Sequence, residues 1–212
     1  MSNPAPLHRL PRSLSDRIAL GFTRLLRFFA DAFFRRRYGH RAVVLETVAA
    51  VPGMVGGLLQ HLKAIRHIRD DQGWIRELLD EAENERMHLM TFIHIAKPSA
   101  FERGLIMVAQ AIFYNLYFFI YLFSAKTAHR IVAYFEEEAV RSYTDYLAEI
   151  DAGRLENVPA PDIAIDYWRL PANARLRDVV IAVREDEMGH RDKNHAFADE
   201  LATGRKAATE SA

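Results

Sequence analysis

The 212-residue chain contains no cysteine, so disulfide bonds, thiolate-bound zinc and thiol-based redox control are excluded. It also carries no excess of charge, because 28 Lys and Arg balance 28 Asp and Glu, and such a chain does not indicate nucleic-acid binding. Strand-like alternation is nearly absent, whereas apolar residues recur at helical spacing along most of the chain. The sequence therefore predicts an all-α protein, long enough for one domain with a sizeable core.

Helical periodicity divides the chain into six predicted helices, at 14–37, 40–69, 72–96, 100–126, 127–151 and 173–203. The residues 152–172 contain three prolines and are predicted to form a long ordered loop. No secretory signal opens the chain, and its Arg-rich start is expected to belong to the mature protein. We expect one domain over 1–212, with the main bundle in 40–198 and a frayed tail in 203–212.

The helix predicted at 14–37 is amphipathic. One face holds Leu14, Ile18, Phe22, Leu25 and Phe29, and the arginines fall elsewhere. Apolar and aromatic residues opposite arginine are typical of a helix that lies in a membrane interface, although a helix packed on a protein core gives a similar pattern. We expect an amphipathic membrane helix here.

Residues 104–125 contain no charged side chain over 22 positions, which is long enough for a transmembrane helix. The candidate metal ligands described below, however, occur both before and after this segment. A spanning helix would place them on opposite sides of the bilayer, so they could not share one site. We therefore expect the helix at 100–126 to lie in one leaflet or to pack in the bundle, and Asn115 with its aromatic neighbours suits an interface.

Two Glu-x-x-His pairs stand out, Glu85 with His88 and Glu187 with His190. Residues three apart share a helix face, so each pair can bind one metal ion. The same faces are otherwise apolar, and a charged group in an apolar stripe is costly unless it is paired or binds metal. A single pair of this kind is usually solvated surface charge. Two pairs, each following a helix with an inward Glu, indicate a two-metal site.

The two inward acids are Glu46 and one member of the triplet Glu136–Glu138. Only one member of the triplet can point fully inward, since each residue advances by about 100° around the helix. The apolar stripe belongs to Glu136, which is therefore the predicted ligand. Glu137 is expected to face water or Arg141, and Glu138 is intermediate.

Four carboxylates and two imidazoles favour a pair of iron or manganese ions over tetrahedral zinc, which normally has fewer carboxylate ligands. Two divalent ions would neutralise the four acids, which would otherwise repel one another in the core. Candidates for orienting the ligands are Asn84, His129, Asp186 and Asn194. The histidines expected to be ordinary surface or core residues are His8, His40, His61, His67, His94 and His195.

The chain resembles the alternative oxidase family over about residues 38–198. The motifs that carry the resemblance are LETVAAVPGM at 45–54, NERMHLM at 84–90, FEEEAV at 135–140 and REDEMGHRDKNH at 184–195, with HR at 129–130 and DYWRLP at 166–171. The family implies a ferritin-like four-helix di-iron carboxylate bundle plus two membrane-interfacial helices, usually as a homodimer. Its metal ligands fall on Glu46, Glu85, His88, Glu136, Glu187 and His190.

The resemblance also implies roles that spacing alone does not supply. Tyr143 matches a tyrosine beside the iron pair that is proposed to take part in redox chemistry, although a core aromatic would look the same. The positions that match the quinol pocket are Arg41, Leu45, Glu138 and Ala139. A hydrogen-bonded network around the site is implied for Asn84, His129, Tyr167, Trp168 and Asp186. Phe135, Met188 and Gly189 depart from the usual family pattern.

By this resemblance, the expected activity is that of a ubiquinol oxidase that couples quinol oxidation to four-electron reduction of O2 to water, without pumping protons. The expected cofactor is two iron ions per chain, and the expected partners are ubiquinol, O2, membrane lipid and a second copy of the chain. The expected location is the cytoplasmic face of a bacterial inner membrane. Three alternatives stay open: another membrane-bound di-iron quinone enzyme, such as a hydroxylase or plastoquinol oxidase, a ferritin-like iron-binding bundle, and a non-catalytic membrane scaffold.

Overall fold

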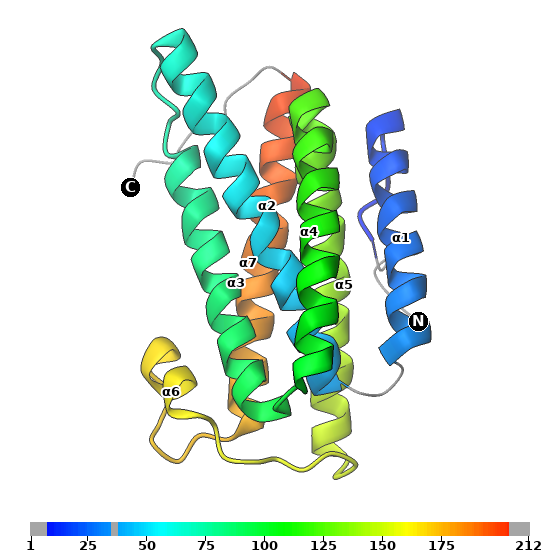
Figure 1. The fold of residues 1–212 in the computed structure, drawn as a ribbon, viewed down its shortest axis with the longest axis vertical. Coiled ribbons are helices and arrows are strands. Elements are labelled where there is room, and N and C mark those ends of the chain that lie inside the picture. Colours follow the sequence, from blue (N-terminus) through cyan, green and yellow to red (C-terminus); the bar gives the residue numbers. More distant parts are fainter. Residues whose placement is uncertain (1–7, 35–37, 204–212) are drawn as a thin grey trace, which may run out of the picture.

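The computed structural model describes residues 8–34 and 38–203, and these residues form helices and no strand (Figure 1). The helices are α1 (Leu14–Phe34), α2 (Tyr38–His67), α3 (Trp74–Ala96), α4 (Ala100–Phe123), α5 (Ala125–Asp151), α6 (Asp162–Trp168) and α7 (Leu176–Thr203). The all-α prediction is confirmed. The predicted end of the first helix at 35–37 and the tail from 204 lie outside the described residues.

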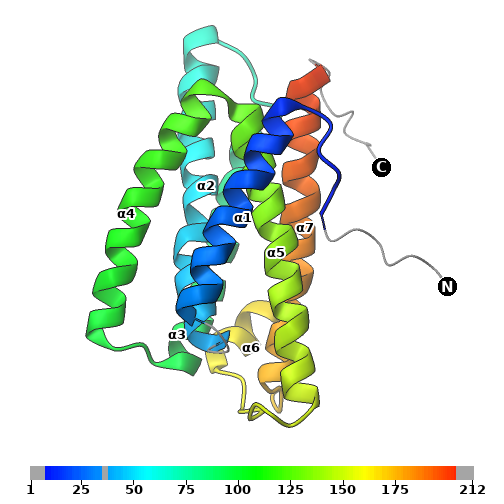
Figure 2. The same ribbon diagram turned by 90° about the vertical axis from the view of Figure 1, so that its right-hand side faces the viewer.

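Four long helices, α2, α3, α5 and α7, form the bundle. α2 packs along α3, and α5 packs along α7. Outside the bundle, α1 lies across α5, and α4 lies against α2 and α5 (Figure 2). The predicted ferritin-like bundle with two additional helices is thus present, and α1 and α4 cover its α2 and α5 side.

The boundary between α4 and α5 is a single residue, Ser124, a little earlier than predicted. Its backbone N–H donates to the carbonyl of Ile120 and closes α4, and its side chain accepts from the N–H of Thr127 at the start of α5. One serine therefore caps both helices, because its hydroxyl replaces a missing helical partner.

The predicted loop at 152–172 contains a short helix that the prediction missed. α6 begins directly after Pro161 and ends at Trp168, and the next residue, Arg169, adopts a left-handed φ of 52°. The prolines obscured this helix, since proline is well tolerated where a helix begins. α6 lies against α3, at the end of the bundle where the chain returns into α7 (Figure 1).

The close approach of α2 to α3 depends on Gly53. A Cβ atom added to this residue would lie 2.3 Å from the carbonyl oxygen of Leu78 and 2.9 Å from the Cβ atom of Ala82. These atoms cannot move aside without shifting the backbone of α3. The contact matters for the site described below, because α2 carries Glu46 and α3 carries the first Glu-x-x-His pair.

We predict that Gly53→Ala lowers the free energy of unfolding by roughly 1–3 kcal/mol, as overpacking in a close-packed core usually does. The measurement is thermal or denaturant unfolding of the purified protein. Gly189→Ala is the control, because no atom lies within 4 Å of the position that its Cβ would occupy. Replacing this helical glycine should stabilise by up to about 1 kcal/mol. Equal effects of the two substitutions would contradict the explanation.

Candidate metal centre

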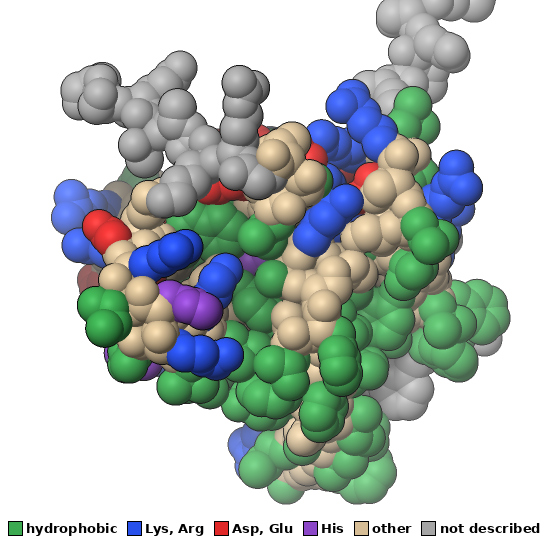
Figure 3. All heavy atoms as spheres, turned by 90° about the horizontal axis from the view of Figure 1, so that it is seen from above, with side chains coloured by type: hydrophobic (Ala, Val, Ile, Leu, Met, Phe, Trp, Pro, Cys, Tyr) green, Lys and Arg blue, Asp and Glu red, His purple; other side chains and the backbone are tan. Residues whose placement is uncertain are grey.

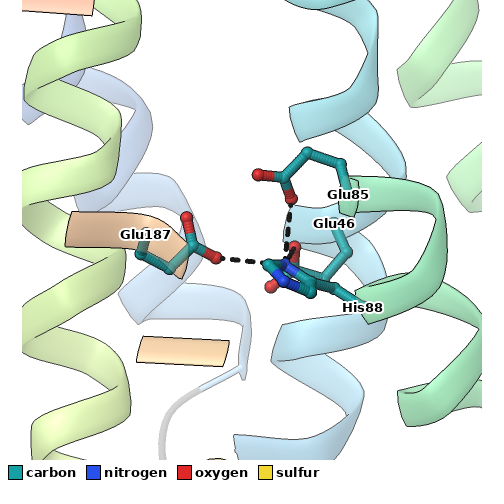
Figure 4. Close-up of side chains that lie close together, drawn as sticks. All are labelled: Glu46, Glu85, His88 and Glu187. Atoms are coloured by element: carbon teal, nitrogen blue, oxygen red, sulfur yellow. Dashed lines mark hydrogen bonds and ion pairs between the residues drawn. The ribbon is translucent and has the colours of Figure 1, made fainter. Parts of the chain in front are cut away.

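Glu46, Glu85, His88 and Glu187 meet at one point in the core of the bundle (Figure 4). One possible ligand atom from each lies within 4.8 Å of the others. The four residues are at most 2% exposed. They come from α2, α3 and α7, so helices far apart in the sequence build one acidic cluster.

His88 turns its Nδ1 atom toward the carboxylates. This atom lies 3.3 Å from oxygens of Glu46 and Glu85 and 3.4 Å from Glu187. Its other nitrogen, Nε2, lies 3.1 Å from Asp186. A carboxylate on the outer nitrogen fixes the orientation of the ring and leaves the inner nitrogen as the ligand atom.

His190 and Glu136 adjoin this cluster. His190 Nδ1 lies 2.7 Å from an oxygen of Glu85 and 3.9 Å from Glu187. Glu136 comes from α5, is buried, and lies close enough to Glu187 for the charge of Glu187 to raise its pKa. All six predicted ligands therefore surround one buried volume, although the tightest group contains only four of them.

Burial and mutual repulsion govern the charges in this cluster. Burial raises the pKa of Glu46 and of Glu136 well above the usual range, and the neighbouring Glu187 raises both further. Burial acts in the same direction on Glu85, but the two histidines outweigh it and hold its pKa well below the ordinary value. Burial would lower the pKa of both histidines, yet the surrounding acids raise it well above its ordinary value. The acids thus require positive charge among them.

Several buried polar atoms of the cluster make no hydrogen bond. They are both carboxylate oxygens of Glu85, Oε2 of Glu187 and Nδ1 of His190. The last of these is close to Glu85, but the orientation of the two groups is not that of a hydrogen bond. A buried, unpaired carboxylate is costly, and coordination to a metal removes that cost. Carboxylate oxygens with imidazole nitrogens suit iron or manganese, so the residues fit a pair of such ions.

Asp186 organises the hydrogen bonds behind His88. Besides His88, it accepts hydrogen bonds from the Trp168 ring N–H at 2.8 Å and from the Asn84 amide at 3.0 Å. The Asn84 amide also lies 2.9 Å from the hydroxyl of Tyr167. Four of the five residues that the resemblance places in a network are therefore joined, and α6 supplies two of them.

His129 lies in a different buried network. Its Nδ1 lies 2.9 Å from the side-chain oxygen of Asn194, and its Nε2 lies 3.1 Å from the hydroxyl of Tyr121. The amide of Asn194 also donates to Glu81 at 2.8 Å and to the carbonyl of His190 at 3.1 Å. Burial lowers the pKa of His129 to about 4, so this ring is neutral at physiological pH.

Sequence analysis did not identify Glu81 as a residue near the centre. It is buried, and burial raises its pKa to about 7. A signal was present, because Glu81 precedes Glu85 by four positions and so lies on the same apolar stripe of its helix. Glu81 has no histidine three positions later, so it is not part of a Glu-x-x-His pair.

The prediction for Glu137 is wrong. Its carboxylate does not face water but is buried, 2.6 Å from His8 and 2.8 Å from His195. His8 and His195, which were expected to be ordinary surface or core residues, are both buried and pair with this acid. Both partners come from distant parts of the chain, and the spacing of residues within one helix does not reveal them.

A cavity of 410 Å³ reaches the cluster from the side covered by α1 and α4. Its walls include the four residues predicted to bind substrate, Arg41, Leu45, Glu138 and Ala139. They also include four residues of the cluster and its surroundings, Glu46, Glu136, Tyr143 and Glu187. The hydroxyl of Tyr143 donates to Glu46. The cavity therefore joins the predicted substrate position to the predicted metal position.

Charged residues bridge α1 to the two helices on either side of this cavity. Arg41 of α2 lies 2.5 Å from Asp31 of α1, and Arg27 of α1 lies 2.9 Å from the same Asp31. Arg27 also contacts Glu138 of α5. These ion pairs place polar groups in an otherwise mostly apolar cavity.

Helices that bring carboxylates and imidazoles to one buried point define the class of ferritin-like carboxylate bundles. A family model described as "Alternative oxidase" matches residues 1–199 of the chain. The chain therefore belongs to the alternative oxidase family, whose members are di-iron proteins. The resemblance found in the sequence is thereby confirmed.

Several curated relatives are similar over nearly the whole chain. A protein named "Ubiquinol oxidase, mitochondrial" from Batrachochytrium dendrobatidis is 60% identical over 197 residues, covering 93% of this chain and 62% of its own length. "Ubiquinol oxidase 1a, mitochondrial" of Oryza sativa subsp. japonica is 59% identical over 192 residues, 91% of this chain and 58% of its own. The protein of that name from Arabidopsis thaliana is 58% identical over 199 residues, 94% of this chain and 56% of its own. The chain thus spans about three fifths of the length of these relatives.

We predict that Glu136→Gln abolishes or strongly reduces iron binding, because a neutral amide replaces one of the carboxylates that balance the metal charge. The measurement is iron per chain in the purified protein. Glu138→Gln is the matched control from the same triplet. It lines the cavity and should retain iron. Retention of iron by Glu136→Gln would remove this residue from the ligand set.

We predict that Asp186→Asn weakens iron binding by about 10- to 100-fold, the usual effect of removing a carboxylate that orients a ligating histidine. Competition with a chelator of known affinity measures the change. Asp192→Asn serves as the control, since Asp192 is exposed and pairs with Arg191 at 2.8 Å. Equal iron affinities of the two variants would show that Asp186 does not act through His88.

Proposed function

We propose that the chain is a ubiquinol oxidase that oxidises two quinols for each O2 reduced to two water molecules. The observation that carries this proposal is the cavity shared by the quinol-pocket positions and the acidic cluster. The names of the relatives support it. Two iron ions per chain, held by the six predicted ligands, would supply the electron transfer to O2.

Residues along the cavity would bind the quinol, and residues at its inner end would connect the quinol to the acidic cluster. The apolar walls keep water from the quinol ring, while Arg41 and Glu138 offer charged groups to its oxygen substituents. Tyr143 lies at the inner end, between this position and the cluster. Burial raises the pKa of Tyr143 well above its ordinary value, and Glu46 raises it further, so the proton stays on the hydroxyl that is hydrogen-bonded to Glu46.

We also propose that α1 and α4 attach the protein to one leaflet of a membrane. Exposed apolar residues on α1 are Leu14, Ile18, Leu25, Phe28 and Phe29, and on α4 they are Phe101, Leu105, Met107, Val108, Ile112, Leu116, Phe119, Leu122 and Phe123. Seen from one end of the bundle, hydrophobic side chains gather along the lower and right margins, over α4 and α1 (Figure 3). A contiguous apolar face of this kind is typical of a membrane-binding surface.

Two helices, α2 and α4, are long and apolar enough to cross a membrane. In α2, 61% of the most apolar 18-residue stretch is buried inside the protein, as expected for a bundle helix. In α4, only 22% of the corresponding stretch is buried. The residues before and after α4 meet in one cluster, which supports an α4 that lies along the membrane surface. Attachment to one leaflet offers protons no route across the bilayer, so the reaction would not pump them.

A homodimer is part of the proposal. Met54, Leu58, Leu62 and Ile65 form an exposed apolar stripe along α2, and Leu79 of α3 is also exposed. The stripe points away from the bundle core, and a second copy of the chain would cover it. The cytoplasmic face of a bacterial inner membrane stays a prediction, and the names of the relatives say mitochondrial.

The alternatives have less support. The relatives are named as oxidases of ubiquinol, which favours that substrate over plastoquinol and favours oxidation over ring hydroxylation. The exposed apolar faces of α1 and α4 are unlike the polar surface of a soluble iron-storage bundle. A non-catalytic scaffold would leave the buried acids and the adjoining cavity without a role.

The purified protein should consume O2 with ubiquinol-1 in the presence of cyanide, with about two quinols oxidised per O2, since four electrons are needed to form two waters. Oxygen-electrode traces with parallel measurement of quinone absorbance check the rate and the ratio. Glu136→Gln, prepared identically, is the background control. Loss of activity on adding cyanide would indicate a haem contaminant. An oxygenated quinone product at a ratio near one would indicate a hydroxylase.

A further inference from the structure

Two consecutive residues that precede α1 hold two consecutive acids of α5. His8 Nδ1 lies 2.6 Å from Glu137, and His8 Nε2 lies 2.9 Å from Glu138. The backbone N–H of Arg9 also donates to Glu137 at 3.0 Å. The His8 ring packs edge-on against Tyr134 at 5.9 Å, and the Tyr134 hydroxyl donates to the carbonyl of Arg9. This segment is therefore fixed on α5 by several contacts.

Glu137 has a second support that does not depend on His8. Arg130 donates to His195 Nδ1 at 2.6 Å. Because a guanidinium only donates, this nitrogen of His195 accepts, and the hydrogen of the ring lies on Nε2. That nitrogen donates to Glu137 at 2.8 Å. Removal of His8 would therefore leave Glu137 held by His195 and by the Arg9 backbone.

Glu138 has fewer supports. Within the described part of the chain, its ionic partners are His8 on one carboxylate oxygen and Arg27 on the other. Its side chain is 12% exposed, so an oxygen that lost its partner would gain little from water. The orientation of this carboxylate therefore depends on His8 more than that of Glu137 does.

Glu138 forms part of the wall between two hollows. On one side is the 410 Å³ cavity that reaches Tyr143 and the acidic cluster. On the other is an open pocket of 370 Å³, lined by Arg24 and Arg141 as well as by His8 and Arg9. No ion pair joins Arg24 or Arg141 to an acid among residues 8–34 and 38–203. Their guanidinium groups would attract a Glu138 carboxylate that His8 no longer held.

We propose that His8 is a positioning residue for the quinol site. It holds the Glu138 carboxylate in the cavity wall and prevents it from turning toward Arg24 and Arg141. This inference rests on the proposed function, because it assigns the effect to quinol binding. His8 does not line the cavity, so its effect on a quinol there would pass through Glu138.

His8→Phe tests the inference, because phenylalanine keeps the ring that packs against Tyr134 and removes both nitrogens. We expect the KM for ubiquinol-1 to rise about tenfold, the effect of one lost buried charged contact, with kcat and iron content within about twofold of the unaltered enzyme. Adding Arg24→Gln and Arg141→Gln should return KM to within about threefold, because the competing cations are gone. His94→Phe is the control, since the exposed His94 ring bonds the carbonyl of Met90 in its own helix.

An unchanged KM in His8→Phe, with only a lower melting temperature, would reduce His8 to a structural clamp and overturn the inference. A raised KM that the two arginine replacements fail to relieve would overturn it as well. If His8→Phe does not accumulate, His8→Gln keeps one donor and should raise KM by about threefold. Unaltered protein that does not oxidise ubiquinol-1 would remove the proposed function and this inference together. Normal oxidation with an unaffected KM in the variant would remove the inference alone.

Discussion

Buried carboxylates can share one point in a protein core only if positive charge lies among them. Glu46, Glu85, Glu136 and Glu187 meet under this constraint, and much of the fold serves it. Gly53 lets two of the helices that carry them approach each other. α6 brings the indole of Trp168 to the Asp186 carboxylate beside His88, and the phenol of Tyr167 to the Asn84 amide that also bonds Asp186. The bundle is thus organised around a repulsion that the bound cations would relieve.

α1 reverses the arrangement of an ordinary surface helix. Asp16, Arg27 and Asp31 pair with charged residues of α2 and α5. The exposed residues of α1 nevertheless include five large apolar ones, Leu14, Ile18, Leu25, Phe28 and Phe29. In water this arrangement would expose a large apolar area. Against lipid it is favourable, and it puts charged groups at the cavity where a quinol would meet them. Under the proposed function, one helix would therefore serve both membrane attachment and substrate binding.

Helical spacing predicted the four side chains that the structure brings closest together, Glu46, Glu85, His88 and Glu187. The pairs at positions 85 and 88 and at 187 and 190 follow from the helix period, and the choice of Glu136 from the triplet follows from the apolar stripe beside it. The features that could not be predicted from the sequence depend on contacts between distant parts of the chain. Glu137 is buried because His8 and His195 reach it from far along the chain, and α6 was hidden by prolines that in fact start it. The quinol-pocket positions, and Tyr167 and Trp168 of the network, came from family resemblance alone.

Ser124 joins α4 to α5 without a flexible linker. A change in the tilt of α4 would therefore bear on the first turns of α5, and Glu136 follows about three turns later in the same helix. If α4 rests in lipid as proposed, the lateral pressure and thickness of the bilayer would act on α4 and, through Ser124, on the helix that carries Glu136. The lipid composition of the membrane could then alter the position of Glu136, and with it the rate of the reaction, through a single serine.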